Sequence, residues 1–216
     1  MASQVKQKRM ISLGFTEERV PEGHHLCYIF NDEGERRRVI AKYLESGMLA
    51  KEKILYLVDV MTPQEMLSCL EELGVDIRTK AKNFQVTDAG EGYCPTGIFD
   101  KDEMLNAVRD LYRSAVENDG CPGARISGEM SWCLVKGRTE EAEVLEYEAR
   151  LNDLLTDYPC TAVCQYDVRR FSGELILDVL SVHPFMIVRG QLVKNPYYVE
   201  PGVFLREYRA RKELNG

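Results

Sequence analysis

The sequence lacks any long uninterrupted apolar run. No segment of the 216-residue chain is apolar over a length that could act as a secretion signal or cross a membrane, and the N-terminal segment Met1 to Met10 is polar. We therefore expect a cytoplasmic protein without membrane association. An excess of basic residues is also missing, because 35 acidic residues outnumber 28 basic ones and give a formal net charge of −7. That balance offers no electrostatic footprint for DNA or RNA, so direct nucleic-acid binding is not expected.

The seven cysteines show neither the spacing of a disulfide framework nor that of a zinc finger. We expect them to be reduced and to serve mostly as small core residues. Cys160 and Cys164 would share one face of an extended segment, but that segment would hold them too far apart for one tetrahedral metal ion. The sequence therefore predicts no metal site, and it gives no sign of a cofactor.

No internal repeat, low-complexity tract or linker divides the chain. With 44% apolar and 29% charged residues, the composition is that of an ordinary globular protein. The length suits one domain with a substantial core better than two small ones. We expect residues 1–20 to be an N-terminal extension and residues 21–216 to form a single domain.

Strand-like runs alternate with helix-like runs along the chain. This pattern predicts an α/β protein with three layers, in which a mostly parallel central sheet has helices on both faces. The expected strands are 26–30, 54–58, 84–86, 124–127, 161–166, 185–188 and 191–193, with a hairpin turn at Arg189-Gly190. The expected helices are 36–47, 63–73, 172–180 and three that start near 100, 139 and 201. The clearest helix start is Thr62-Pro63-Gln64-Glu65, which has the residues of a capping box.

The first strand-to-helix turn, Asn31-Asp32-Glu33-Gly34-Glu35, does not have the composition of a phosphate-binding loop. Such a loop needs several glycines, a lysine for the phosphates and a hydroxyl for magnesium. The acidic side chains of this turn would instead repel a triphosphate. We interpret the following Arg36, Arg37 and Arg38 as a solvated helix face. In the alternative interpretation they offset the acidic charge and form a divergent nucleotide site with Glu129.

Ligands of doubly wound sheets bind beyond the carboxyl ends of the strands, which directs attention to the residues that follow each expected strand. Glu129 would be a hydrogen-bond acceptor there, and Trp132 could form an apolar wall or part of the core. Cys164, Tyr166 and Asp167 end the next strand and could line a small pocket. We expect the loop from Asp88 to Gly97 to close a cavity between these two strand ends.

The histidines give the remaining candidates. His24 and His25 are adjacent near the start of the first strand. Successive side chains of a strand point to opposite faces of the sheet, so at most one of the two faces a pocket. Tyr28 follows on the same strand and is subject to the same alternation of faces. His183 precedes Pro184, which ends its helix and leaves the imidazole free to bond backbone or ligand. A nucleophilic pairing of Cys164 with His183 remains an alternative, and no residue is assigned a catalytic role. The complete set of candidate ligand-binding residues is His24, His25, Tyr28, Glu129, Trp132, Cys164, Tyr166, Asp167 and His183.

Several segments resemble one known family in their order and spacing. His24-His25-Leu26-Cys27-Tyr28-Ile29-Phe30, the helix end Glu45-Ser46-Gly47 and Lys53-Ile54-Leu55-Tyr56-Leu57-Val58 are similar to the start of the methanogen/methylotroph DcmR sensory (MEDS) domain. Cys164-Gln165-Tyr166-Asp167, Leu180-Ser181-Val182-His183-Pro184 and Asn195-Pro196-Tyr197-Tyr198-Val199 extend the resemblance into the C-terminal half. The similarity spans about Gly23 to Leu205.

This resemblance implies a RecA- or KaiC-like ATPase scaffold that lacks the Walker A loop and senses simple hydrocarbon derivatives in prokaryotic signal transduction. We therefore expect a non-catalytic sensory domain that binds a small, mostly apolar molecule and acts on a signalling partner protein whose identity the sequence does not give. One alternative is a divergent RecA-like nucleotide-binding protein or ATPase. Another is a protein-interaction module without a ligand. Assembly into a homo-oligomer also remains open.

Overall fold

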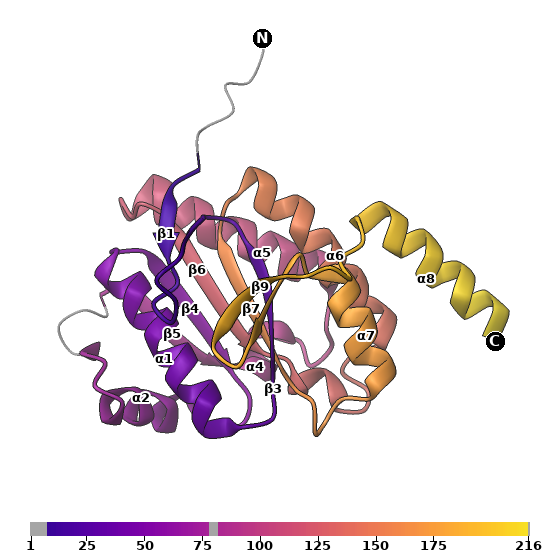
Figure 1. Ribbon diagram of the computed structural model, residues 1–216, viewed down its shortest axis with the longest axis horizontal. Helices are drawn as coiled ribbons and strands as arrows, with labels where there is room; N and C mark the ends of the chain where they lie inside the picture. Colours follow the sequence, from indigo (N-terminus) through magenta and orange to yellow (C-terminus); the bar gives the residue numbers. More distant parts are fainter. Residues whose placement is uncertain (1–7, 78–81, 216) are drawn as a thin grey trace, which may run out of the picture.

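A seven-stranded sheet forms the centre of the molecule (Figure 1). The computed structural model describes residues 8–77 and 82–215. The strand order is β5-β4-β6-β7-β3-β8-β9, and every neighbouring pair is parallel except the antiparallel pair β8–β9. The strands are β3 (His25–Phe30), β4 (Lys53–Val58), β5 (Phe84–Asp88), β6 (Ala124–Glu129), β7 (Thr161–Asp167), β8 (Phe185–Val188) and β9 (Gln191–Lys194). The predicted mostly parallel sheet is confirmed.

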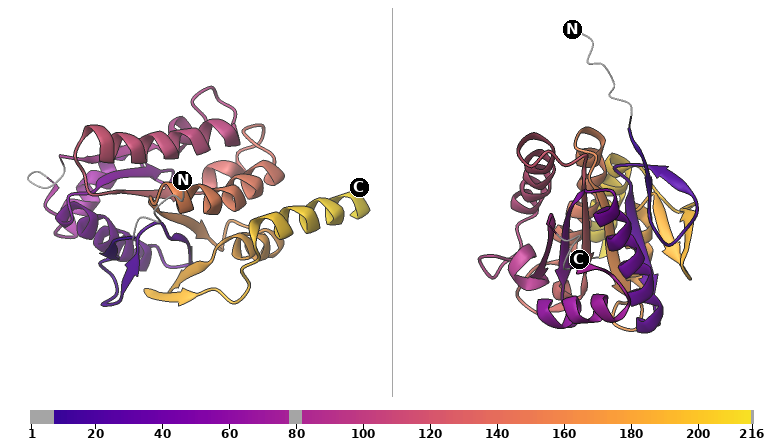
Figure 2. Two further views of the ribbon diagram at one scale, coloured as in Figure 1. Left: turned by 90° about the horizontal axis from the view of Figure 1, so that it is seen from above. Right: turned by 90° about the vertical axis from the view of Figure 1, so that its left-hand side faces the viewer.

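Helices cover both faces of this sheet, which confirms the predicted three layers (Figure 2). Apolar residues of α1 and α2 pack on one face, whereas those of α4, α5, α6, α7 and α8 pack on the other. In the left view of Figure 2, α8 extends away from the body of the molecule. The helices are α1 (Glu33–Leu49), α2 (Pro63–Glu72), α4 (Ala89–Tyr93), α5 (Lys101–Arg113), α6 (Glu141–Asp157), α7 (Gly173–Val182) and α8 (Pro201–Asn215). A π-helical turn (Ser114–Asn118) follows α5, and a 3₁₀ turn (Ser131–Leu134) follows β6.

Local sequence signals explain most of the element boundaries. Thr62 and Glu65 form the predicted reciprocal capping box at the start of α2. The side chain of Ser172 caps α7 by accepting from the backbone N–H of Leu175. The hairpin between β8 and β9 is also confirmed, and Arg189 and Gly190 both have a positive φ, as its tight turn requires.

Two predicted boundaries were wrong, and both were shifted by an aspartate cap. Helix α1 begins at Glu33 rather than at Arg36, because the Asp32 carboxylate accepts from the backbone N–H of Glu35 at 2.9 Å. The expected loop from Asp88 to Gly97 contains α4, whose N-terminus is capped by the Asp88 carboxylate. The acidic turn after β3 is therefore already part of a helix.

Residues before the sheet form a small antiparallel ribbon of β1 (Met10–Ser12) and β2 (Arg19–Pro21). The ribbon packs on the same face of the sheet as α1, where Ile11 and Val20 are buried. It is also held by Arg125, whose Nη2 donates to the carbonyl oxygen of Ser12 at 2.8 Å. Among residues 8–77 and 82–215, no helix is both long and apolar enough to cross a membrane.

Candidate functional site

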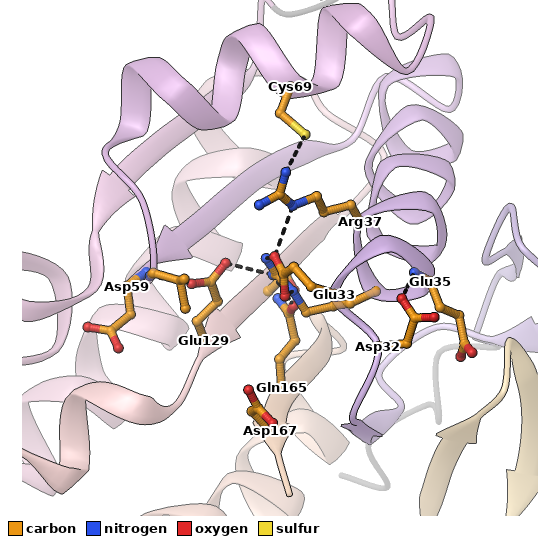
Figure 3. Close-up of polar contacts among 12 residues, drawn as sticks. Asp32, Glu33, Glu35, Arg37, Asp59, Cys69, Glu129, Gln165 and Asp167 are labelled. Atoms are coloured by element: carbon orange, nitrogen blue, oxygen red, sulfur yellow. Dashed lines mark hydrogen bonds and ion pairs between the residues drawn. The ribbon is translucent and has the colours of Figure 1, made fainter. Parts of the chain in front are cut away.

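The side chain of Arg36 lies fully buried at the carboxyl ends of the central strands, where α1 begins. Its Nη1 donates to the hydroxyl of Tyr56 at 3.0 Å, to Oε1 of Glu129 at 2.7 Å and to Oε1 of Gln165 at 2.8 Å. The Nε and Nη2 groups both donate to the carboxylate of Glu33. Figure 3 shows Glu33, Glu129 and Gln165 pointing toward this one centre from three different elements.

Glu129 is the acidic partner of this network, and both of its carboxylate oxygens are engaged. Oε1 accepts from Arg36 and from the hydroxyl of Tyr56, the latter at 2.8 Å. Oε2 accepts from the backbone N–H groups of Asp59 and Val60, each at 2.8 Å. Burial alone would lower the pKa of Arg36, but the surrounding phenol and carboxylates outweigh it and raise that pKa, so the guanidinium stays charged.

The interpretation of Arg36 to Arg38 as a solvated helix face was wrong for its first member. Arg38 is exposed and Arg37 is partly exposed, but the side chain of Arg36 has no exposed surface. Arg36 lies three and four residues before Val39 and Ile40, so it shares the buried stripe of α1. A buried guanidinium is tolerated here because Glu129 and Glu33 compensate its charge.

A second polar cluster lies on the opposite face of the sheet, around the carboxylate of Glu148 in α6. The hydroxyl of Tyr166 donates to Oε1 at 2.7 Å. Three groups surround Oε2: the Nε2 of His25 at 2.9 Å, the Sγ of Cys164 at 3.4 Å and the Nε2 of His183 at 3.4 Å. All five side chains are buried.

Burial and the neighbouring side chains together shift the pKa values of this cluster. It lowers the pKa of His25 to about 4, with a further contribution from the neighbouring His183. Burial would raise the pKa of Glu148, but the imidazoles of His183 and His25 outweigh it and the pKa of Glu148 is lowered. Burial and the charge of Glu148 raise the pKa of Tyr166, which keeps its hydroxyl as a donor. The carboxylate of Glu148 therefore lies beside a His25 imidazole and a Tyr166 hydroxyl that are both uncharged near neutral pH.

The cavity expected beneath the segment from Asp88 to Gly97 is filled by aromatic side chains. Tyr93 of α4 stacks on Trp132 with ring centroids 4.6 Å apart, and Phe99 and Tyr147 pack around this pair. Trp132 is completely buried, and its indole N–H has no hydrogen-bond partner. Trp132 is therefore a core residue, because α4 carries Tyr93 onto its ring.

Two small apolar cavities are lined by residues outside this aromatic group. One has a volume of about 140 Å³ and lies between α5 and the strands β4, β5 and β6, with Met104, Val108, Leu55, Leu57 and Ile126 among its lining residues. The other has a volume of about 100 Å³ and is lined by Cys133, Leu134, Glu141, Val144, Tyr166, Leu175 and Val179. The second cavity adjoins the Glu148 cluster, since the two share Tyr166.

The other candidate residues lie apart from the Glu148 cluster. Tyr28 is buried on the opposite face of the sheet, where its hydroxyl donates to a carboxylate of α1. His24 stacks on the ring of Phe185, with centroids 4.2 Å apart, and burial lowers its pKa to about 4. Asp167 forms an ion pair with Arg169. Of the nine candidates, the structure thus brings together His25, Cys164, Tyr166 and His183, and it places Glu129 in the Arg36 network.

Sequence reasoning missed the central residue of the second cluster. Glu148 was not among the nine candidate residues, although a helix was expected to start near residue 139. Position 148 lies four residues after Val144 and three before Leu151, which places it on the buried stripe of that helix. A carboxylate within an apolar stripe is the signal that could have identified it.

Comparison with known proteins agrees with this architecture. The family model described as MEthanogen/methylotroph, DcmR Sensory domain (MEDS) matches residues 24–184. The transcriptional repressor DcmR of Methylorubrum extorquens is 29% identical over 160 residues, which are 74% of this chain and 57% of the repressor. The chain therefore spans less than two thirds of that relative. A KaiC-like protein from the archaeon Pyrococcus horikoshii OT3 has a TM-score of 0.57 at 14% identity, over 83% of this chain and 79% of that chain, which shows a shared fold.

Proposed function

We propose that this chain, which belongs to the methanogen/methylotroph DcmR sensory (MEDS) family, is a non-catalytic sensory domain for a small, mostly apolar molecule. The domain then comprises residues 21–216. By likeness to the transcriptional repressor DcmR, its output is a regulatory signal. That signal passes to a signalling partner protein or to a second copy of the chain.

The cavity beside Tyr166 carries this proposal. Its volume of about 100 Å³ is smaller than the roughly 150 Å³ of an engineered apolar cavity that binds benzene. It therefore suits a molecule of only a few heavy atoms. Leu134, Val144, Leu175 and Val179 give it apolar walls, which favour a hydrocarbon derivative over a polar metabolite.

The position of Tyr166 explains how occupancy would be detected. One side of this residue lines the cavity, and its hydroxyl lies 2.7 Å from Glu148. A molecule that moves the phenol ring therefore changes the hydrogen bonding of a buried carboxylate, where the low dielectric makes such a change large. Val179 also lines the cavity, and its carbonyl oxygen accepts from His183 at 2.8 Å. The ligand thus touches two of the groups that hold the cluster in place.

The Arg36 network argues against the nucleotide-binding alternative. An ATP-dependent mechanism at the carboxyl ends of the strands would need an open anion site and a carboxylate free to act on water. Here the guanidinium of Arg36 and both oxygens of Glu129 are already bound to groups of the chain itself. We expect no stabilisation of this protein by ATP and magnesium.

Thermal unfolding with a panel of small alkyl and haloalkyl compounds tests the proposal. A compound present at a hundred times its dissociation constant should add about 2.7 kcal/mol to the free energy of unfolding. Leu134→Trp should abolish this stabilisation by filling the cavity beside Tyr166. Its matched control, Ala107→Trp, adds the same ring to the wall of the other cavity and should leave the stabilisation intact. Both positions are exposed, so both variants should fold.

Three results would contradict the proposal. Loss of binding in Ala107→Trp alone would move the site to the cavity beneath α5. Stabilisation by ATP and magnesium would restore the nucleotide-binding alternative. If no compound of the panel stabilises the wild-type protein, and mass spectrometry of the native protein finds no retained small molecule, a protein-interaction module remains.

A further inference from the structure

Four potential metal ligands from different parts of the sequence converge next to Tyr166. They are an imidazole nitrogen of His25 in β3, a carboxylate oxygen of Glu148 in α6, the thiol of Cys164 in β7 and an imidazole nitrogen of His183, the residue that follows α7. These four atoms all lie within 4.8 Å of one another, and all four residues are buried. Among residues 8–77 and 82–215, no other group of three or more such side chains comes together in this way.

The hydrogen bonds of the two imidazoles fix which ring nitrogens carry protons. Nδ1 of His183 lies 2.8 Å from the carbonyl oxygen of Val179 and must donate to it, which in a neutral ring puts the lone pair on Nε2. Nδ1 of His25 lies 3.2 Å from Oδ1 of Asn152. The Nδ2 of Asn152 donates to the carbonyl oxygen of Val182 at 2.8 Å, so Oδ1 is the acceptor, and a neutral His25 ring likewise has its lone pair on Nε2.

The resulting site contains more acceptors than donors. With both imidazoles neutral, their two nitrogen lone pairs face the same oxygen of Glu148, and the Cys164 thiol is the one proton donor left among the four groups. Nε2 of His183 is buried and has no hydrogen-bond partner. A buried unpaired nitrogen beside a buried carboxylate costs free energy that a cation at the centre would recover.

We propose that His25, Glu148, Cys164 and His183 bind one divalent transition-metal ion of the zinc type. A tetrahedral zinc ion with Zn–N distances of about 2.0 Å and a Zn–S distance of about 2.3 Å holds its ligand atoms roughly 3.3 to 3.6 Å apart. The Sγ of Cys164 lies 3.5 Å from His25 and 3.4 Å from Glu148, and His183 lies 3.4 Å from Glu148. The mixed sulfur, nitrogen and oxygen donors suit zinc better than magnesium or calcium.

Charge balance supports the same ion. Binding replaces the thiol proton of Cys164 with the metal and releases that proton to solvent. The two positive charges of the ion are then matched by one thiolate and one carboxylate, while both imidazoles stay neutral. A site without net charge is the arrangement that a buried position tolerates best.

The groups around the four ligands would hold them in this orientation. Tyr166 donates to the free carboxylate oxygen of Glu148, and Val179 and Asn152 bind the outer nitrogens of the two imidazoles. Such second hydrogen bonds are what metal-bound histidines and carboxylates generally have. The metal site does not depend on the proposed sensory function, although Tyr166 would link the two.

Metal analysis of the full chain, purified without chelators, is the first test. We expect close to one zinc ion per chain, and one proton released when zinc is added to metal-free protein. Cobalt(II) added to the metal-free wild-type protein should give the intense visible bands of a tetrahedral ion and a sulfur-to-cobalt charge-transfer band. If wild-type protein neither retains nor binds zinc, and cobalt gives no such bands, the proposal is wrong.

Matched variants identify the ligands. Cys164→Ser should remove the charge-transfer band, and His183→Ala should lower zinc affinity by at least tenfold. Cys160→Ser and His24→Ala change a neighbouring thiol and a neighbouring imidazole outside the cluster and should keep full binding. If either control loses the metal as completely as the ligand variants, these four residues are not the site. The wild-type cobalt spectrum decides the matter even where a ligand variant does not fold.

Discussion

The Nη1 atom of Arg36 lies 2.7 Å from Oε1 of Glu129, inside a region that solvent does not reach. Arg36 begins the buried stripe of the first helix of the sheet domain, and Glu129 ends a central strand. Their contact joins two charges that would each be costly alone in the interior. This chain shares its fold with a KaiC-like protein. At the end of the strand that Glu129 closes, the space is filled by an internal ion pair.

Removing Arg36 should destabilise the protein strongly. Arg36→Met leaves the buried carboxylate of Glu129 without its charge partner, and we expect a loss of about 3–5 kcal/mol in the free energy of unfolding. The double variant Arg36→Met with Glu129→Gln should lose less than the sum of the two single changes. Urea unfolding measures all three. The control is Arg38→Met, at an exposed position of the same helix, which should change stability by no more than about 0.5 kcal/mol. Additive losses in the double variant would show that Arg36 and Glu129 are not coupled.

A methyl group at Gly128 should collide with Tyr93. A Cβ atom built there would lie 2.0 Å from the hydroxyl oxygen of Tyr93, so Gly128→Ala should cost about 1–3 kcal/mol through overpacking. Tyr93→Phe in the same chain should recover part of the loss, because the hydroxyl is the closest atom. Gly173→Ala, which meets nothing within 4 Å, is the control for the substitution itself. An unchanged melting temperature in Gly128→Ala would mean that α4 does not pack closely on β6.

Loss of the capping box should weaken α2 by a predictable amount. The backbone N–H of Glu65 donates to the hydroxyl of Thr62, and the Glu65 carboxylate accepts from the Thr62 backbone N–H at 2.8 Å. Thr62→Ala should therefore lower stability by about 1 kcal/mol. Ser68→Ala removes a hydroxyl from the middle of the same helix and should have a smaller effect in the same unfolding experiment. Equal effects of the two changes would argue against a capping role.

Cys69 should be the first thiol to react with an alkylating agent in the native protein. It is partly exposed on α2, whereas Cys27 and Cys160 are buried. Burial also raises the pKa of the partly exposed Cys133 thiol to about 12, so little reactive thiolate forms there at mildly alkaline pH. Peptide mass spectrometry after brief iodoacetamide treatment should find the label at Cys69, and Cys69→Ser should lack the fast phase. Faster labelling of Cys133 would show that its environment opens in solution.

Local signals in the sequence were sufficient for most elements and for the fold class. The apolar run of β4, the capping box of α2 and the turn between β8 and β9 all depend on residues close together in the chain. The start of α1 was misplaced because Asp32 was judged by its charge beside a phosphate group, whereas its carboxylate acts as a helix cap. The family resemblance, which the match over residues 24–184 confirms, came from the same kind of short segments.

The sequence by itself determined the alternation of strands and helices, the acidic turn without a phosphate-binding lysine and four members of the Glu148 cluster as candidates. Only the tertiary structure decided that Arg36 is buried and that Glu148 completes the cluster. The Arg36–Glu129 bond joins residues 93 positions apart, and Cys164 meets His25 across 139 positions. A charged side chain on an amphipathic helix is stable in the interior only where folding brings compensating groups to it, and no local pattern specifies those groups.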